Sequence, residues 1–346
     1  MKKKGIKKLD FPRIASGLIT TLLIWLTIWL LRSLIPLPQP ESGGPPLLYA
    51  NQQHEDLREN FLNAINKAEK SILLVIYSLN DRFIIEALKR KSLQGLDVKV
   101  IYDPTATKKI RSALGKKVQV HLRHDKGIMH RKILVIDERV AWIGSANFTT
   151  DSLLMHGNLV LGFHHSPLSQ WLTEKAKNMI DEEETVGSKD FDAGGQKMKV
   201  CFFPEDSEGV ERLVQLIRTA EKSVKIAMFT WTRFDLADEV IEAQRKGIKS
   251  EVVIDRSSGK GVSAKIVKYL KKGGVPVRLS NGNGLLHHKF LYIDGKTLVN
   301  GSANWTAAAF TKNDDCFIIL ENLTPHQQQK LDDLWDIILA ESTICK

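Results

Sequence analysis

Two stretches of the sequence decide the fold: MHRKILVIDERVAWIGSAN, residues 129–147, and HHKFLYIDGKTLVNGSAN, residues 287–304. Each contains a His and a Lys two residues apart, followed at identical spacing by Asp, Gly, Ser and Asn. The matched pairs are His130 and His287, Lys132 and Lys289, Asp137 and Asp294, Gly144 and Gly301, Ser145 and Ser302, and Asn147 and Asn304. A single His-x-Lys is a weak signal, but six identities in register indicate an internal duplication.

The duplication extends well upstream of the two stretches. AINKAEKSILLVIYSL, from Ala64, matches LIRTAEKSVKIAMFTW, from Leu216, and each runs from a helical pattern into a β-rich apolar stretch. DVKVIYD and KSEVVID then follow as a further strand in each copy. This alternation predicts an α/β fold of two similar α-β-α lobes with mostly parallel sheets, each closed by an antiparallel hairpin.

The spacing sets the predicted domain boundaries. We predict one lobe at residues 50–182, a linker at 183–197 and a second lobe at 198–341. Two copies of this size pair naturally about a local two-fold axis, which brings matching surfaces together. The two polar constellations are therefore expected to meet at one shared site, so that a single chain suffices for a complete site.

The polar residues indicate an anion site. On a strand, His287 and Lys289 point to the same face, and an imidazole beside an ammonium suits a phosphate. Asp294 has the opposite parity and begins a DG turn, so we interpret it, and its counterpart Asp137, as partly architectural. The small residues of GSAN permit close backbone approach, and the Asn amide can donate to a phosphate oxygen.

The pattern His-x-Lys-x4-Asp-x6-Gly-Ser-x-Asn, present twice, resembles the phospholipase D superfamily over nearly all of residues 50–341. The resemblance implies phosphodiester chemistry without a metal or cofactor. One histidine attacks phosphorus to give a phosphohistidine, the other protonates the leaving oxygen and then activates water, and the lysines and asparagines hold the non-bridging oxygens. The predicted catalytic residues are His130, Lys132, Asp137, Asn147, His287, Lys289, Asp294 and Asn304.

Four further residues are predicted to support the site. Ser145 and Ser302 belong to the two motifs. The family often places an acid fourteen residues after the motif glycine, which gives Asp315 as the expected partner of His287 and the neutral Asn158 in the first copy. Because family members usually attack with the N-terminal histidine, His130 is expected to be the nucleophile and His287 the acid.

The N-terminal region predicts a membrane anchor. A basic start precedes an uncharged apolar run from Ile14 to Leu31, about 27 Å long as a helix. Residues 1–35 are thus predicted to be a basic flank and single-pass helix, followed by a Pro/Gly linker at 36–49. The basic flank predicts a cytoplasmic N-terminus and extracytoplasmic lobes. The alternative is a cleaved signal peptide and a secreted enzyme.

Composition limits the classes of protein to which the chain can belong. Three cysteines are too few for a disulfide framework or a zinc cluster, and half of the net charge of +10 belongs to residues 1–46. The leading prediction is a phospholipase D-type hydrolase of phospholipid headgroups. The alternatives are a membrane-anchored nuclease, a phosphatidyl transferase of the cardiolipin synthase kind, and a non-catalytic module that binds anionic lipid or nucleic acid.

Overall fold

The computed structural model describes residues 37–108, 110–123, 127–183 and 186–345, together with Thr21 and Trp25. The chain divides into two units, Met1–Pro38 and Gln39–Lys346. The predicted anchor at residues 14–31 lies outside the described residues. Within the described part of the chain, no helix combines the length and the apolar character needed to cross a bilayer.

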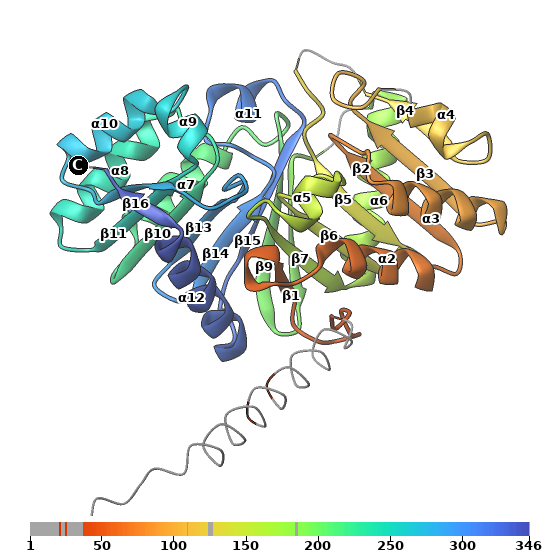
Figure 1. Ribbon diagram of the computed structural model, residues 1–346, viewed down its shortest axis with the longest axis horizontal. Helices are drawn as coiled ribbons and strands as arrows, with labels where there is room; N and C mark the ends of the chain where they lie inside the picture. Colours follow the sequence, from red (N-terminus) through yellow and green to blue (C-terminus); the bar gives the residue numbers. More distant parts are fainter. Residues whose placement is uncertain are drawn as a thin grey trace, which may run out of the picture. The chain divides into compact units, whose positions relative to one another are not determined.

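The second unit contains two lobes, each built on one sheet (Figure 1). The first lobe has a seven-stranded sheet in the order β1-β7-β6-β5-β2-β3-β4. Its strands are β1 (Leu47–Ala50), β2 (Ser71–Ile76), β3 (Asp97–Tyr102), β4 (Gln119–Leu122), β5 (Lys132–Ile136), β6 (Val140–Gly144) and β7 (Leu159–His164). Its helices are η1 (Asn51–Gln53), α2 (Leu57–Lys67), α3 (Arg82–Leu93), α4 (Ile110–Leu114), α5 (Thr150–Leu154) and α6 (Ser166–Asp181).

The second lobe repeats this order and extends it at both edges, as β16-β12-β11-β10-β13-β14-β15-β9-β8. Its strands are β8 (Ser188–Ala193), β9 (Gln196–Phe203), β10 (Ser223–Met228), β11 (Lys249–Ile254), β12 (Val277–Ser280), β13 (Lys289–Ile293), β14 (Thr297–Gly301), β15 (Asp315–Leu320) and β16 (Ser342–Ile344). Its helices are α7 (Gly209–Arg218), α8 (Phe234–Arg245), α9 (Arg256–Lys260), α10 (Ala264–Lys272), α11 (Ala307–Thr311) and α12 (Pro325–Ala340).

Local sequence explains the elements that carry the site. Every residue of β5 (KILVI) and β13 (KFLYI) is buried, as expected for central strands covered on both faces. The long helices begin at clear signals. In α12, Thr324 and Gln327 form a capping box with Pro325 in the first turn, and Asp81 caps α3 by accepting from the backbone N–H groups of Phe83 and Ile84.

The prediction of mostly parallel sheets is wrong. Only β2–β3–β4 and β10–β11–β12 pair in parallel, whereas the ladders from β5 through β7 and from β13 through β15 are antiparallel. The strand–helix alternation that produces parallel crossovers stops after β4 and β12. Beyond that point, a three-residue turn joins β5 to β6 and β13 to β14, and such short connections favour antiparallel pairing. Strands β7 and β15 are antiparallel to their neighbours too, although the short helices α5 and α11 precede them.

The predicted linkers contain strands. Residues 36–49 include most of β1, which pairs with β7, and residues 183–197 include β8 and the start of β9. Gly194 and Gly195, both at positive φ, make the tight turn between β8 and β9. The second lobe also runs past residue 341, because β16 pairs with β12.

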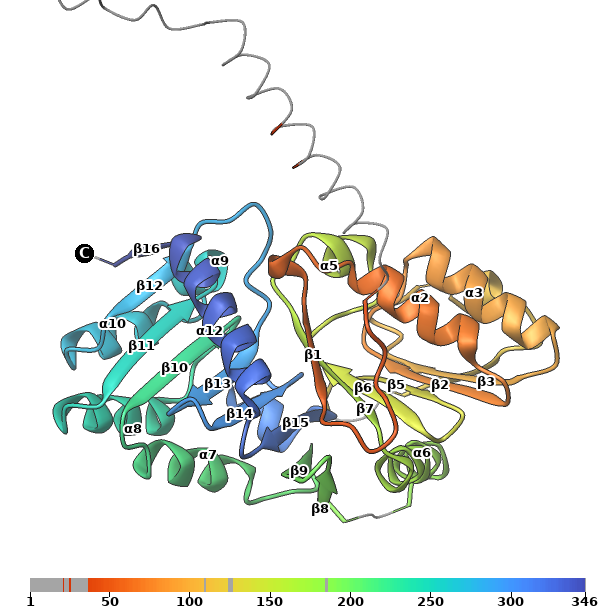
Figure 2. The ribbon, with the colours of Figure 1, turned by 90° about the horizontal axis from the view of Figure 1, so that it is seen from below.

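The lobes share one core and exchange elements reciprocally. Leu161 of β7, Phe290 of β13 and Ile318 of β15 belong to the same buried cluster. Helix α6 of the first lobe places Trp171 against Phe202 of the second, while α12 of the second lobe packs on β1 and η1 of the first (Figure 2). Such reciprocal contacts are produced by a local two-fold axis.

Candidate active site

The two histidines lie at the interface of the lobes, each just before the central strand of its sheet. In each lobe, a carboxylate that follows the strand two places away in the sheet, β3 or β11, holds the backbone immediately before the histidine. Asp103 Oδ2 accepts from the N–H of Met129 at 2.8 Å, and Asp255 Oδ2 accepts from the N–H of Leu286 at 3.0 Å. Sequence reasoning did not include Asp103 and Asp255 among the site residues. Their signal was their recurrence at the end of matching strands.

Each histidine takes its partner from the opposite lobe. His130 Nδ1 lies 2.8 Å from Asp315 Oδ1, and His287 Nδ1 lies 3.1 Å from Asn158 Oδ1. The predicted pairing of Asp315 with His287 is therefore wrong. Counting along one repeat found the right residues, but the two-fold arrangement exchanges them. Bonding through Nδ1 leaves Nε2 of both rings available for chemistry.

The motif serines lock these partners in place. Ser302 Oγ donates to Asp315 Oδ1 at 2.6 Å, and Ser145 Oγ donates to Asn158 Oδ1 at 2.9 Å. The supporting role expected for the serines fits this geometry. The motif glycines have a steric reason: a Cβ on Gly144 or Gly301 would lie 2.4 or 2.3 Å from a carbonyl oxygen on the neighbouring strand.

The motif lysines are buried beside their histidines. The side chains of Lys132 and Lys289 are each 3% exposed. Each ammonium donates to the carbonyl oxygen of the histidine two residues earlier, at 2.8 Å for Lys289, and lies over an aromatic ring, Tyr77 or Phe229. Both ammonium groups therefore sit in one dry, aromatic-lined centre.

Burial suppresses positive charge in this centre while it is empty. Desolvation lowers the pKa of Lys132 to about 7 and holds the pKa of Lys289 well below its usual value, where the charge of Lys132 adds to the effect. The pKa of His287 is lowered strongly by burial and then by Lys289. The pKa of His130 is lowered by burial and Lys132, against the opposing effect of Asp315. A bound anion would reverse these shifts.

The motif asparagines have unsatisfied buried atoms. Oδ1 of Asn147 and Oδ1 of Asn304 are buried and have no hydrogen-bond partner among the described residues. A buried amide without a partner is costly, and such groups mark sites that a ligand completes. Rotation of either amide would present its NH₂ group to an anionic oxygen.

Asp137 and Asp294 lie far from the histidines. Both occupy hairpin turns at positive φ, at the far ends of β5 and β13, about 15 Å along the strand from the lysines. Asp294 accepts from the N–H groups of Glu221, Lys222 and Ser223, and Asp137 accepts from those of Glu69, Lys70 and Ser71. This geometry fits the architectural interpretation and not a catalytic one.

The residues that follow the motif histidines differ between the lobes. Arg131 is fully buried and donates to the carbonyl oxygen of Phe203 at 3.0 Å and to Glu205 Oε2 at 2.9 Å. Its counterpart His288 is buried too, and its Nε2 lies 2.6 Å from Gln52 Oε1. Arg131 and His288 thus bond to residues around the centre. They are not part of the pair of rings formed by His130 and His287.

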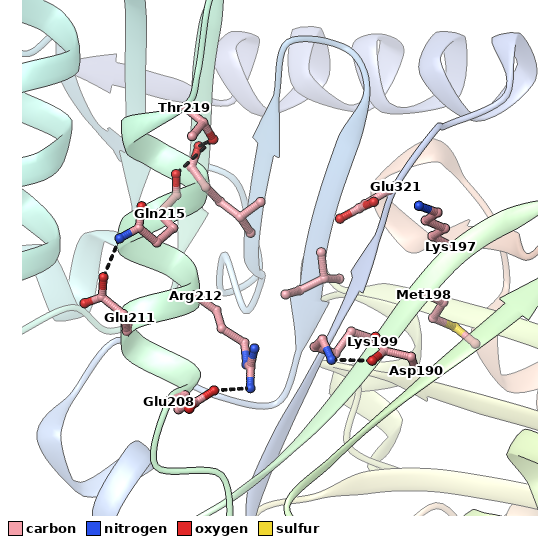
Figure 3. Close-up of a pocket in the computed structure, with 12 residues that line it drawn as sticks. Asp190, Lys197, Met198, Lys199, Glu208, Glu211, Arg212, Gln215, Thr219 and Glu321 are labelled. Atoms are coloured by element: carbon pink, nitrogen blue, oxygen red, sulfur yellow. Dashed lines mark hydrogen bonds and ion pairs between the residues drawn. The ribbon is translucent and has the colours of Figure 1, made fainter.

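A groove of about 580 Å³ between α7 and strands β8, β9 and β15 is a separate feature (Figure 3). Two ion pairs lie in its lining, Arg212 with Glu208 and Lys199 with Asp190. None of the motif residues lines it. Among the described residues, no group of three or more His, Cys, Asp or Glu side chains is placed to hold a metal ion.

Known proteins resemble this chain in sequence. The family described as "Cardiolipin synthase, PLD-like domain" matches residues 61–180 and 213–335, one match in each lobe. The "Mitochondrial cardiolipin hydrolase" of Chlamydomonas reinhardtii is 32% identical over 146 residues, which cover 42% of this chain and 65% of that protein. The chain thus aligns with somewhat less than two thirds of the length of the curated relatives it matches.

Solved structures extend the likeness to both lobes. Phosphatidylserine synthase of Haemophilus influenzae Rd KW20 superposes with a TM-score of 0.68 at 12% identity, covering 89% of each chain. Polyphosphate kinase from Porphyromonas gingivalis gives a TM-score of 0.63 at 12% identity, covering 87% of this chain and 48% of that one. At such identities these likenesses show the fold alone. Because the family matches cover more than half of the sequence and both His-x-Lys motifs, the chain belongs to the phospholipase D superfamily, with two PLD-like domains in one polypeptide.

Proposed function

We propose that this protein is a phosphodiesterase that works through a phosphohistidine intermediate, with His130 as nucleophile and His287 as general acid and base. One observation carries the proposal: two imidazoles, each held through Nδ1 by the opposite lobe, meet in one buried centre with two lysines. A covalent intermediate divides one difficult displacement into two easier steps.

The asymmetry of the partners supports the two roles. Attack by Nε2 of His130 on phosphorus leaves a positive charge on the ring, and the Asp315 carboxylate at 2.8 Å from Nδ1 compensates it. Asn158, next to His287, orients its ring without adding charge. As the bond between phosphorus and the leaving oxygen breaks, His287 gives that oxygen its proton. Water then returns a proton to His287 and attacks phosphorus, which frees His130.

Substrate binding prepares the centre for this sequence. A diester brings one negative charge between the lysines, and this charge raises the pKa of Lys132, Lys289 and His287 from their lowered values. The lysines then hold the non-bridging oxygens as full cations, and His287 acquires the proton that it must donate. The amides of Asn147 and Asn304 find partners in the same oxygens.

The substrate class that we propose is the phospholipid headgroup diester. Relatives named cardiolipin hydrolase and phospholipase D support it. The apolar run at residues 14–31 supports a membrane anchor with the lobes on the extracytoplasmic side, with signal-peptide cleavage as the alternative. Alkaline extraction of membranes and protease protection of intact cells test this arrangement. An anchored protein stays in the pellet and is digested from outside.

A turnover assay tests the function. The full chain in detergent is offered phospholipid vesicles in one arm and single- and double-stranded DNA and RNA in the other, with EDTA present and His130→Ala as control. Headgroup release that vanishes in the variant supports the phospholipase. Nucleic-acid cleavage alone indicates a nuclease, transfer to an added alcohol indicates a phosphatidyl transferase, and silence in both arms indicates a binding module.

Acid quenching during turnover tests the assignment of the two histidines. We expect label from a phosphoryl-labelled substrate to accumulate on the peptide that contains His130, and more strongly in the His287→Ala protein, because loss of the base slows hydrolysis of the intermediate. Label on the peptide that contains His287 would reverse the two roles while leaving the phosphodiesterase activity in place.

A further inference from the structure

A pocket of about 360 Å³ opens beside His287, and the centre as described above does not use it. Its wall combines α5 and the loop from α5 to β7 with the segments that follow β11 and β12. His156 belongs to this wall, and the centroid of its ring lies 6.4 Å from that of His287. The pocket therefore adjoins the general acid and not the nucleophile.

Two opposite charges line the pocket without pairing. Asp151 and Arg256 are both exposed, and within the described residues neither side chain forms an ion pair or a hydrogen bond. The third charged group, Asp255, is already satisfied, because it accepts from the N–H groups of Leu286, Ser257 and Ser258. The pocket thus offers one unpaired carboxylate and one unpaired guanidinium to a ligand.

This feature breaks the symmetry of the lobes. The residues at the two-fold-related positions are Ala308 for Asp151 and Pro104 for Arg256, so neither charge is repeated beside His130. Asn313, the counterpart of His156, accepts from the N–H of Ile128 at 3.3 Å and joins its own loop to the neighbouring one. No such bond ties the His156 side chain to a neighbour within the described residues. The charged pocket was therefore not simply inherited with the repeat.

We infer that this pocket receives the leaving alcohol of the diester, and that it fits a small alcohol carrying both an ammonium and an acid group. The ammonium lies against Asp151 and the acid group against Arg256. The inference rests on the proposed function, because a general acid must stand beside the leaving oxygen and so fixes the alcohol on the His287 side. A volume of about 360 Å³ is at the small end of ligand pockets and suits a headgroup, not an acyl chain.

His156 completes the pocket as a positioning residue. Burial lowers its pKa, so its ring stays neutral and does not compete with Arg256 for an acid group. A neutral imidazole between the pocket and His287 can accept from or donate to the alcohol without adding charge beside the acid. Replacement by the residue of the other lobe, His156→Asn, should lower kcat more than it raises KM.

The test compares three phospholipids with identical acyl chains in mixed micelles. Phosphatidylserine offers both charges on its leaving alcohol, phosphatidylethanolamine only the ammonium, and phosphatidylglycerol neither. The full chain is assayed as wild type, Arg256→Gln and Asp151→Asn. Arg139→Gln is the matched control, because Arg139 is exposed in the β5–β6 turn at the far end of the strand.

We expect kcat/KM to be highest for phosphatidylserine. Arg256→Gln should lower it on that lipid by about five- to tenfold, the effect of one partly exposed charged contact, and should lower it less on phosphatidylethanolamine. Asp151→Asn should lower it on both amino lipids, and Arg139→Gln on none. A preference for phosphatidylglycerol, or equal lipid ratios in all four proteins, would overturn the inference and leave the phosphodiesterase standing.

A binding measurement separates the inference from turnover. In the His130→Ala background, glycerophosphoserine should bind more weakly by about five- to tenfold when Arg256→Gln is added, whereas glycerophosphoglycerol should not distinguish the two proteins. Wild-type protein that turns over no lipid refutes the proposed function instead. Cleavage of single-stranded DNA that depends on Arg256, without lipid turnover, would assign the pocket to a nucleotide and overturn the zwitterionic alcohol.

Discussion

Asp315 gives His130 a charged partner, while Asn158 gives His287 a neutral one, and in the proposed mechanism this difference lets two identical rings take different roles. Replacement Asp315→Asn should make the two partners alike. Because the carboxylate raises the pKa of His130 against the effects of burial and Lys132, its loss should lower that pKa further. We expect kcat to fall by roughly 10²–10³-fold, the usual effect of losing one preorganised group that stabilises developing charge. Acid-quench trapping should show less phosphohistidine.

The reciprocal change provides the control. Asn158→Asp should raise the pKa of His287. Because His287 must be protonated to act as the acid, the alkaline limb of the pH profile of kcat/KM should move to higher pH while the fold is retained. An Asp315→Asn protein with the wild-type profile would show that the carboxylate does not tune the nucleophile.

Lys132 illustrates the cost of a dry anion site. Its pKa falls from the usual 10.5 to about 7 on burial, so the unfolded chain binds more protons than the folded one between these values. This residue therefore destabilises the empty protein fully below about pH 7, and the penalty is relieved as the pH rises. Lys132→Met should stabilise the protein by about 1–3 kcal/mol at pH 6 and abolish turnover. Chemical denaturation of the wild-type and Lys132→Met proteins measures the difference in stability, which should be larger at pH 6 than at pH 9.

Anion affinity should follow the same titration. Sulfate keeps its charge across this range, so the pH dependence of its dissociation constant reports the protonation of groups in the centre. We expect sulfate to bind more weakly as the pH rises through about 7, because Lys132 then loses its proton. Calorimetry between pH 6 and pH 8 tests this expectation, and an affinity that does not change would place the anion elsewhere.

At the scale of elements, the β13–β14 hairpin is pinned to the start of β10 by one side chain. Asp294 accepts three backbone N–H groups, and the bonds from Ser223, Glu221 and Lys222 lower its pKa although burial opposes them. Asp294→Ala leaves these donors without a partner and should cost about 1–3 kcal/mol. Thermal unfolding should show the loss while kcat on the remaining folded protein is kept. A fall in kcat without a fall in Tm would return Asp294 to the chemistry.

Much of this architecture could be predicted from the sequence. The two hairpins, the helices around them and the meeting of both motifs at one centre follow from the duplication. The pairing of Asp315 with His130 did not follow, because counting within one repeat cannot show which lobe a side chain faces. Strands β8 and β16 are edge strands of modest apolar content, and β1 is only four residues long, so their stability depends on neighbours that the local pattern does not reveal.

At the scale of the whole molecule, Arg131 joins the lobes. Its guanidinium bonds Glu205 and the carbonyl oxygen of Phe203 across the interface, and Asp314 lies 3.8 Å away. Burial opposes ionisation of Glu205, but the charges of Arg131 and Lys175 lower its pKa to about 2. Arg131→Ala leaves the buried Asp314 and the exposed Glu205 without this cation and should cost about 1–3 kcal/mol. Denaturation should then begin at the lobe interface, which tryptophan fluorescence of Trp171 can follow.

Glu205 adds a pH dependence of the same sign as that of Lys132, but in a more acidic range. Because its folded pKa is depressed, its contribution to stability is fully present above the unfolded value near 4.5 and is lost as the pH falls toward about 2. The wild-type protein should therefore lose stability in this window more steeply than the Glu205→Gln protein. Parallel curves for the two proteins would exclude the interface pair as the cause.

The exchange of partners between the lobes has a consequence for inheritance. A mutation at residue 315 alters the chemistry of a histidine 185 positions upstream, and a mutation at residue 158 alters one 129 positions downstream. A substitution in one repeat therefore changes the surroundings of the histidine in the other repeat, so the two copies cannot change independently. The duplication has thus become a mutual dependence: the halves are free to specialise, as at the charged pocket beside His287, but not to separate.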